Sequence, residues 1–297
     1  KIEATKSYGA RVVLSNGNFE DAKAEAMEIQ KKEGLTIVHP FDDNAIVAGQ
    51  GTIGLEILEQ LPSVESVVVP VGGGGLISGI ALAIKTLKPS CKIYGVEAES
   101  VPSMRESVSR GEPTEVVSLR TIADGIAVKK PGDLTLEYVK KYVDEIVTVK
   151  EDELAESMIF LLEKKHLLAE GAGVAAVAAC LFNKGPVQQG KTLCVVSGGN
   201  VDMSLLKKVT ENVLRNRGKI ITIEVEIKDS PGELSKLISD IGCLKGNIVE
   251  IRHDRRSDHV SIGNCIASID IEVKDNDHAR VLESELKQKD YILDWRK

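Results

Sequence analysis

Residues 67–79 read Val67-Val68-Val69-Pro70-Val71-Gly72-Gly73-Gly74-Gly75-Leu76-Ile77-Ser78-Gly79, and this stretch carries the fold prediction. Its first half is apolar without polar alternation, which is typical of a strand buried on both faces of a parallel sheet. The glycines follow, and the apolar residues after them predict a helix. A strand that passes through a short turn into a helix is the repeating junction of an α/β protein.

The glycines Gly72, Gly73, Gly74 and Gly75 indicate an anion site. Because glycine has no Cβ, backbone N–H groups can close on a ligand there, and the start of a helix favours negative charge. We therefore predict a bound phosphate, with a turn that serves packing alone as the alternative. The loop is not a P-loop, because no Gly-Lys-Ser/Thr follows. Glu97, roughly 20 residues further on, keeps a dinucleotide site open.

A second glycine turn, Ser197-Gly198-Gly199-Asn200, follows another apolar run at residues 192–196. In open α/β sheets the ligand crevice lies at the carboxyl ends of the strands. Two glycine turns at two such ends therefore predict one ligand held from two sides. A simple turn without a ligand is the alternative.

The flanking residues predict strands that alternate with helices, which indicates a doubly wound α/β domain over residues 1–214. We expect strands at residues 11–14, 36–39, 66–71, 91–96, 145–149 and 192–196. We expect helices at residues 19–33, 51–60, 76–87, 151–165 and 173–182.

The pattern changes at residues 212–219, which are polar and basic and predict a connector with a boundary near Gly218. Strands are expected beyond it at residues 220–228, 247–255, 265–273 and 291–295, and helices at residues 231–241 and 277–289. Ser230 is the expected cap of the first of these helices, with Pro231 at its first position. This βαββαβ order predicts a ferredoxin-like second domain over residues 219–297.

Composition excludes several classes of protein. The chain has 297 residues and a net charge of -7, so electrostatic binding to nucleic acid or to an anionic membrane is disfavoured. No apolar run approaches the roughly 20 residues of a membrane span. The cysteines lack the spacing of a metal or redox motif and are expected to be reduced thiols in a cytoplasmic protein; they are Cys91, Cys180, Cys194, Cys243 and Cys265.

Several ordered runs carry a resemblance to a known family. They are Pro70 to Gly79, Thr121-Ile122-Ala123-Asp124-Gly125, Glu170-Gly171-Ala172-Gly173 and Ser197-Gly198-Gly199-Asn200, and Gly49-Gln50-Gly51-Thr52 after His39-Pro40-Phe41-Asp42-Asp43 also fits. Over roughly residues 1–214 the chain resembles the threonine and serine dehydratases among the fold-type II pyridoxal-phosphate enzymes. Serine racemase is a close relative of that group. The resemblance implies a parallel-sheet domain like that of the tryptophan synthase β chain.

The resemblance also implies a role for individual residues. The backbone of the Gly72–Gly75 loop would hold the phosphate of pyridoxal 5'-phosphate, and Gly125 would lie beside its ring. Ser197 would hydrogen-bond the pyridine nitrogen and leave it largely unprotonated, which suits β-elimination over transamination. Glu170 would lie close to the ring, with an ordinary helix cap as the alternative. Asn200 is expected to shape its loop.

Two parts of the family pattern do not occur in residues 1–297. They are the Ser-Phe-Lys-x-Arg-Gly-like stretch with the Schiff-base lysine, and the Ser-x-Gly-Asn-like loop for the substrate carboxylate. Lys1, Lys6 and Lys23 are interpreted as solvated helix positions, so we name no catalytic lysine. Because the chain starts with lysine and with a helix that looks internal to a domain, we expect both parts upstream and expect the chain to be inactive alone.

Some relatives bind a divalent cation through a glutamate that matches Glu97 and an aspartate six residues later. Ser103 stands at that later position. Because the loss of a carboxylate weakens a site for a hard cation, we expect no metal there.

The second domain contains Lys228-Asp229-Ser230-Pro231-Gly232-Glu233-Leu234. This run resembles the Asp-x-Pro-Gly-x-Leu signature of ACT domains, which are small-molecule sensors that pair across subunits. It implies an effector site in which free N–H groups receive a carboxylate; the residues are Asp229, Pro231, Gly232, Glu233 and Leu234. A purely structural turn is the alternative. The charged residues 252–256 are expected to be a solvated edge or a subunit contact, with effector binding as the alternative.

Together these observations predict a cytoplasmic, homo-oligomeric lyase that uses pyridoxal phosphate. It would deaminate L-threonine and L-serine to a 2-oxo acid and ammonia, under control of an effector at the second domain. A serine racemase or serine dehydratase is one alternative, and a catalytically silent regulatory fragment is another. No nucleic-acid or membrane partner is expected.

Overall fold

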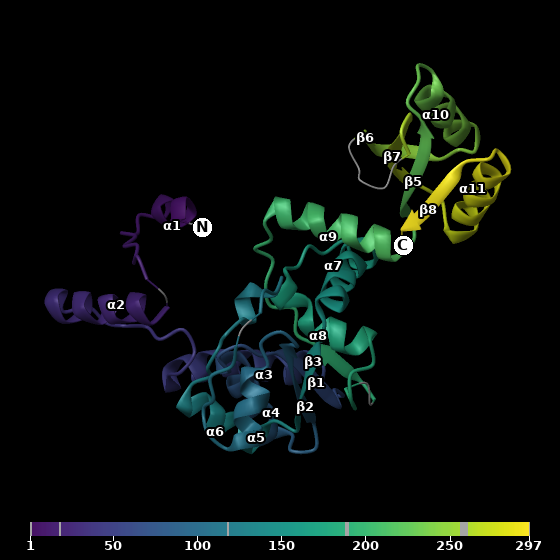
Figure 1. The fold of residues 1–297 in the computed structure, drawn as a ribbon. Coiled ribbons are helices and arrows are strands. Elements are labelled where there is room, and N and C mark those ends of the chain that lie inside the picture. Colours follow the sequence, from purple (N-terminus) through teal and green to yellow (C-terminus); the bar gives the residue numbers. More distant parts are fainter. Residues whose placement is uncertain (1, 18, 118, 188–189, 256–260, 297) are drawn as a thin grey trace.

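The structure is a computed structural model that describes residues 2–17, 19–117, 119–187, 190–255 and 261–296. Its strands form two separate four-stranded sheets (Figure 1). The first sheet belongs to the α/β part of the chain, and the second lies beyond helix α9 (Met203–Asn216). The cysteines are all free.

The first sheet has the strand order β3-β2-β1-β4, and its neighbouring strands are all parallel. The strands are β1 (Ser66–Pro70), β2 (Lys92–Ala98), β3 (Glu145–Val149) and β4 (Thr192–Cys194). Every residue of β1 is buried, which explains why the sequence there is continuously apolar. The predicted parallel-sheet α/β domain is confirmed.

Helices cover both faces of this sheet, because successive residues of β1 enter two different cores. Val68 packs in a core with α7 (Glu151–Lys165), α8 (Gly171–Leu181) and α9. Val67 and Val69 pack in the other core with helices from the opposite side, which are α3 (Asn44–Gln60), α4 (Gly75–Leu87), α5 (Ser103–Arg110) and α6 (Asp133–Tyr142). The alternation of side chains along a strand therefore sets the layers.

Two predicted strands are wrong. Residues 11–14 and 36–39 are irregular, and no strand lies beside either of them in the described parts of the chain. Leu14 is 65% exposed and Val38 is 75% exposed, so the apolar residues that suggested strands have no core to enter. Figure 1 shows α1 (Ile2–Ser7) and α2 (Phe19–Glu33) away from the sheet. Helix α2 has the predicted bounds.

The sequence prediction missed α5, α6 and the short helix η1 (Asp124–Ile126). It also placed a connector over residues 212–219, whereas α9 continues to Asn216. Val209 and Val213 are buried one helical turn apart against the core under α7 and α8. This packing holds the last turn of α9 in place despite its polar and basic composition.

The second sheet has the strand order β6-β7-β5-β8, with antiparallel neighbours throughout. Its elements follow as β5 (Ile220–Lys228), α10 (Glu233–Cys243), β6 (Asn247–Asp254), β7 (Asn264–Glu272), α11 (Asn276–Gln288) and β8 (Ile292–Arg296). This is the βαββαβ order of a ferredoxin-like unit. Both helices pack on one face, where Ile223 of β5 meets Leu237 of α10 and Leu282 of α11.

The predicted start of α10 is wrong. The helix begins at Glu233, and its N-cap is Gly232 in the left-handed region with a φ of 97°. Ser230 and Pro231 therefore lie in the turn before the helix. Glycine suits the cap position because it reaches a positive φ without steric cost.

Candidate functional site

The four-glycine loop joins β1 to α4 at the carboxyl end of the sheet. Gly74 is the N-cap of α4 and has a φ of 95°, which favours glycine. A Cβ added to Gly73 would lie 2.3 Å from the ring of Phe41. A Cβ added to Gly75 would lie 3.0 Å from the backbone of the same residue. The positive φ of Gly74 and the close packing of Phe41 against Gly73 and Gly75 thus require glycine at three successive positions.

The backbone N–H groups of this loop are free to bind a ligand. Within the described residues, no protein atom accepts a hydrogen bond from the N–H groups of Gly72, Gly73, Gly74 or Gly75. They lie at the positive end of α4, and the loop lines a cavity of about 740 Å³. This volume is within the range of small-molecule sites. The loop therefore presents free donors to a space that can hold a phosphorylated ligand.

The second glycine turn lies on the same cavity. Strands β1 and β4 are parallel neighbours, so their carboxyl ends lie side by side. The lining of the cavity also includes Val195, Val196 and Ser197, which follow β4 directly. Gly198 lies behind them, where its carbonyl oxygen accepts a 3.1 Å hydrogen bond from the backbone N–H of Glu170. The structure thus brings together both glycine turns singled out in the sequence, with an exposed hydroxyl at Ser197.

Glu170 and Gly125 complete the wall between the two turns. Glu170 occupies the N-cap position of α8, but its side chain makes no capping hydrogen bond. A Cβ on Gly198 would lie 2.2 Å from Glu170 Oε1, and a Cβ on Gly125 would lie 3.5 Å from the same oxygen. The half-buried carboxylate therefore lies between the two glycines and lines the cavity instead of capping its helix.

Sequence reasoning missed the residue that fixes the glycine loop. Thr135 of α6 is fully buried, and its Oγ1 donates a 2.7 Å hydrogen bond to the carbonyl oxygen of Gly73. Its backbone N–H donates to Asp42 Oδ1 at 3.0 Å, so Asp42 caps α6 from a distant part of the chain. Asp42 stands in a run that carries the family resemblance, and nothing in the local sequence marks Thr135.

Glu97 does not line the cavity. Its carboxylate is 1% exposed and accepts hydrogen bonds from the backbone N–H groups of Met104 at 2.7 Å and Arg105 at 2.9 Å. Burial raises the pKa of Glu97 to about 7, although these hydrogen bonds oppose the shift. Ser103 donates its hydroxyl to the carbonyl oxygen of Val128 at 2.6 Å. Glu97 thus satisfies the start of α5, and the acidic residue on which the dinucleotide alternative rested does not reach the cavity.

The chain's early lysines lie elsewhere. Lys6 and Lys23 are exposed on α1 and α2, and Lys1 lies outside the described residues. The described residues that line the cavity include no lysine.

Among the helices that the structure describes, none has both the length and the apolar character of a membrane span.

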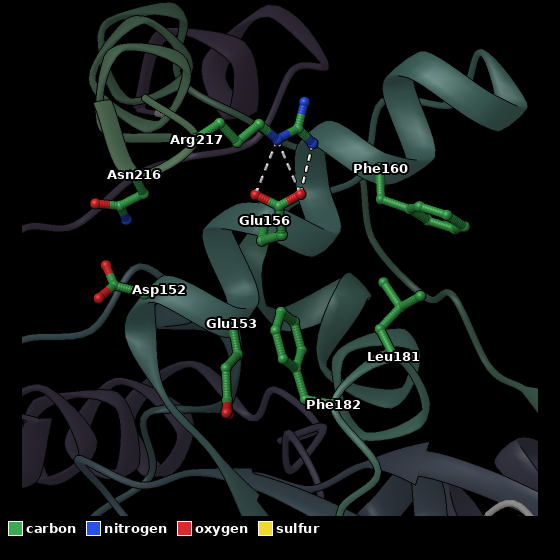
Figure 2. Close-up of a pocket in the computed structure, with 8 residues that line it drawn as sticks. All are labelled: Asp152, Glu153, Glu156, Phe160, Leu181, Phe182, Asn216 and Arg217. Carbon is green, nitrogen blue, oxygen red and sulfur yellow. Dashed lines mark hydrogen bonds and ion pairs between the residues drawn. The ribbon is translucent and has the colours of Figure 1, made fainter. Parts of the chain in front are cut away.

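A second pocket, of about 490 Å³, lies between α7, the end of α8 and the end of α9 (Figure 2). Figure 2 shows the guanidinium of Arg217 facing the carboxylate of Glu156, and their closest contact is 2.5 Å. Arg217 also bonds Glu163 of the same helix at 2.9 Å. Two residues earlier, Arg215 bonds Asp270 of β7 at 2.6 Å and Thr222 of β5 at 2.9 Å. Ion pairs and hydrogen bonds therefore join the end of α9 to α7 beside the first sheet and to strands β5 and β7 of the second sheet.

The predicted effector turn lies between β5 and α10. Asp229, Pro231 and Gly232 are exposed, whereas Glu233 and Leu234 are half-buried. Arg255 donates its Nε to both oxygens of Asp229 at 2.9 Å. The structure therefore groups these residues at one end of the second sheet, and it adds an arginine that the sequence pattern did not assign to the turn.

Known proteins resemble the chain over both units. The family model for pyridoxal-phosphate dependent enzymes matches residues 1–198. The chain belongs to this family. An L-threonine ammonia-lyase of Thermotoga maritima is 46% identical over 291 residues, which cover 98% of this chain and 72% of the relative. One from Geobacter sulfurreducens is 44% identical and covers 99% of the chain and 73% of the relative.

Solved structures give the same result. Processed threonine deaminase isoform 2 of Solanum lycopersicum has a TM-score of 0.66 and 36% identity, over 71% of this chain and 58% of that one. Maize serine racemase has a TM-score of 0.66 and 32% identity, over 73% and 67% of the two chains. This chain therefore spans less than two thirds of the tomato enzyme. Pyridoxal phosphate is the cofactor of the family, and the free N–H groups of the glycine loop suit its phosphate.

Proposed function

We propose that this chain is the cofactor-binding and regulatory part of a cytoplasmic threonine ammonia-lyase, which converts L-threonine and L-serine to a 2-oxo acid and ammonia. The observation that carries the proposal is the set of free N–H groups at Gly72–Gly75, which line the same cavity as Ser197. Relatives that share 46% and 44% identity bear this name. When bound, pyridoxal phosphate withdraws electrons from the substrate's Cα, which labilises the α-proton and lets the β-hydroxyl leave.

The residues of the chain would then divide the work. The backbone of the glycine loop would hold the phosphate, and Thr135 would hold the loop through the carbonyl oxygen of Gly73. Ser197 would offer its hydroxyl to the pyridine nitrogen, and Gly125 and Glu170 would lie beside the ring. We propose that no lysine of this chain bonds the cofactor, because none of the described lining residues is a lysine.

Equilibrium dialysis of the full chain against pyridoxal phosphate tests the site. We expect one cofactor per chain, displaced by excess inorganic phosphate because both anions compete for the same N–H groups. Binding that phosphate does not affect would contradict the phosphate role of the loop. Borohydride reduction followed by peptide mapping tests the lysine proposal, which fails if one lysine of residues 1–297 is labelled stoichiometrically.

We further propose that the second unit is an ACT domain that senses a small molecule and works in a homo-oligomer. The effector site would comprise Asp229, Pro231, Gly232, Glu233 and Leu234. Arg215 and Arg217 support a route to the cofactor cavity, because they attach the end of α9 to the second sheet and to α7. Isothermal titration with isoleucine, valine and nucleotides tests the sensor, and the absence of binding by all of them would refute it.

A further inference from the structure

Three metal-ligating side chains meet at one end of the second sheet. They are Asp229, which follows β5, His253 of β6 and Cys265 of β7, and their ligand atoms all lie within 4.8 Å of one another. His253 Nε2 and Cys265 Sγ are 2.9 Å apart. Two of the donors belong to different strands and the third follows another strand, so the tertiary fold assembles them.

The strand register explains why these side chains converge. Cys265 is paired with Ile227, and His253 is paired with Ala267. Directly paired residues point to the same face of a sheet, as do residues two apart along a strand. Cys265 and Ala267 therefore share a face with His253, and this is the face that α10 and α11 cover. Asp229 continues the line of Ile227 beyond the end of β5.

The burial of the three donors is graded. Cys265 is 1% exposed, whereas Asp229 and His253 are exposed. The sulfur therefore forms the floor of the cluster, and the carboxylate and imidazole form an open rim through which an ion can enter.

We propose that Asp229, His253 and Cys265 bind a divalent transition-metal ion of the zinc type. One oxygen, one nitrogen and one sulfur donor with an added water are a ligand set that such ions accept in tetrahedral geometry. Bond lengths of about 2.0–2.3 Å place tetrahedral ligand atoms about 3.5 Å apart. The imidazole and the thiol would therefore separate by roughly half an ångström when the ion enters between them.

Arg255 competes with the ion for the carboxylate of Asp229. It donates to both oxygens of Asp229, but its side chain is 63% exposed and can turn toward solvent. Removal of the guanidinium should therefore strengthen metal binding.

Titration of the metal-free, cofactor-free full chain with Co²⁺ tests the site, read as a difference absorption spectrum in reducing buffer. We expect one Co²⁺ per chain with a thiolate-to-cobalt charge-transfer band. Cys265→Ser should abolish the band, and His253→Ala should weaken binding at least about tenfold. Cys243→Ser is the matched control, because Cys243 is an exposed thiol on α10 outside the cluster, and it should keep both. Arg255→Gln should bind more tightly than the parent chain.

Three results would overturn the proposal: no stoichiometric Co²⁺ binding, a band that survives in Cys265→Ser, or a band lost in Cys243→Ser. Far-UV circular dichroism verifies folding, and His253→Ala decides the matter if Cys265→Ser unfolds. Co²⁺ should also raise the melting temperature of the parent chain but not of the His253→Ala variant. Asp229 is the one residue that the metal cluster and the proposed effector turn have in common. Cys265→Ser therefore tests metal binding without changing a residue of the effector turn.

Discussion

The buried carboxylate of Glu97 predicts a specific dependence of stability on pH. Its pKa is raised from 4.5 to about 7, chiefly by burial. Between these two values the folded state binds more protons at this group than the unfolded state does. The contribution of Glu97 to the free energy of unfolding should therefore be fully present below pH 4.5 and should be lost as the pH rises through about 7.

The size of the effect follows from the shift. A change from 4.5 to about 7, at about 1.4 kcal/mol per pKa unit, corresponds to about 3 kcal/mol lost across this window. Glu97→Gln removes the charge but keeps the shape. Its amide NH2, like the hydroxyl of the protonated acid, faces a backbone N–H and leaves one hydrogen bond unmade, at a cost of about 1–3 kcal/mol. The variant should thus behave like the parent at low pH and lack the decline above it.

Urea unfolding at several pH values from about 5 to 8, followed by far-UV circular dichroism, measures the difference. Tryptophan fluorescence is unsuitable, because the single tryptophan, Trp295, belongs to β8 of the other unit. Glu99→Gln is the control, since it makes the same charge change two residues away on an exposed side chain. The reasoning is refuted if Glu97→Gln loses stability with pH as steeply as the parent, or if Glu99→Gln flattens the curve as well.

Three further changes test the site and its supports. Gly74→Ala should weaken pyridoxal phosphate binding and should cost more than the about 1–2 kcal/mol of backbone strain, because its Cβ would lie 2.5 Å from Met104 Cε. Gly111→Ala, which has a φ of 83° and open space around it, should cost only that strain and leave binding unchanged in dialysis. Thr135→Val should lower the urea-derived stability by about 1–3 kcal/mol, because the carbonyl of Gly73 loses its donor. Arg217→Ala should cost about 1 kcal/mol, measured likewise, and Arg280→Ala on exposed α11 should cost less.

Each of these has an outcome that would contradict it. Equal cofactor affinity in Gly74→Ala and Gly111→Ala would show that the loop holds no phosphate. An unchanged midpoint in Thr135→Val would mean that the loop does not depend on α6. Equal losses of stability in Arg217→Ala and Arg280→Ala would mean that the ion pair of Arg217 with Glu156 contributes no more than an exposed surface pair.

The sequence predicted those parts of the fold that local patterns determine. The continuous apolar run of β1 and the glycines after it sufficed to place the central strand and the start of α4. Helix α7 has the predicted bounds, because its acidic first turn and basic last turn mark both ends. Both glycine turns reach the same cavity because the carboxyl ends of parallel neighbours lie together.

Features that depend on distant residues escaped prediction. Thr135 contacts the glycine loop from 62 residues away, and Asp42 caps α6 from 93 residues away. Residues 11–14 have the composition of a strand, but a strand also needs a neighbour to share hydrogen bonds, and composition does not reveal one. The cluster of Asp229, His253 and Cys265 likewise emerges only from the strand register.

The three residues between α9 and β5 leave almost no slack. Gly218 has a φ of 69°, and its N–H bonds the carbonyl oxygen of Arg215 at 2.8 Å. The N–H of Lys219 bonds the carbonyl oxygen of Leu214 at 2.8 Å, and its own carbonyl oxygen accepts from Val273 at 2.9 Å. A different second unit joined at this point would need a matching first strand and a partner for Arg215. Residues inserted after Gly218 would break the hydrogen bond from Lys219 to Leu214 and would let the two units move independently.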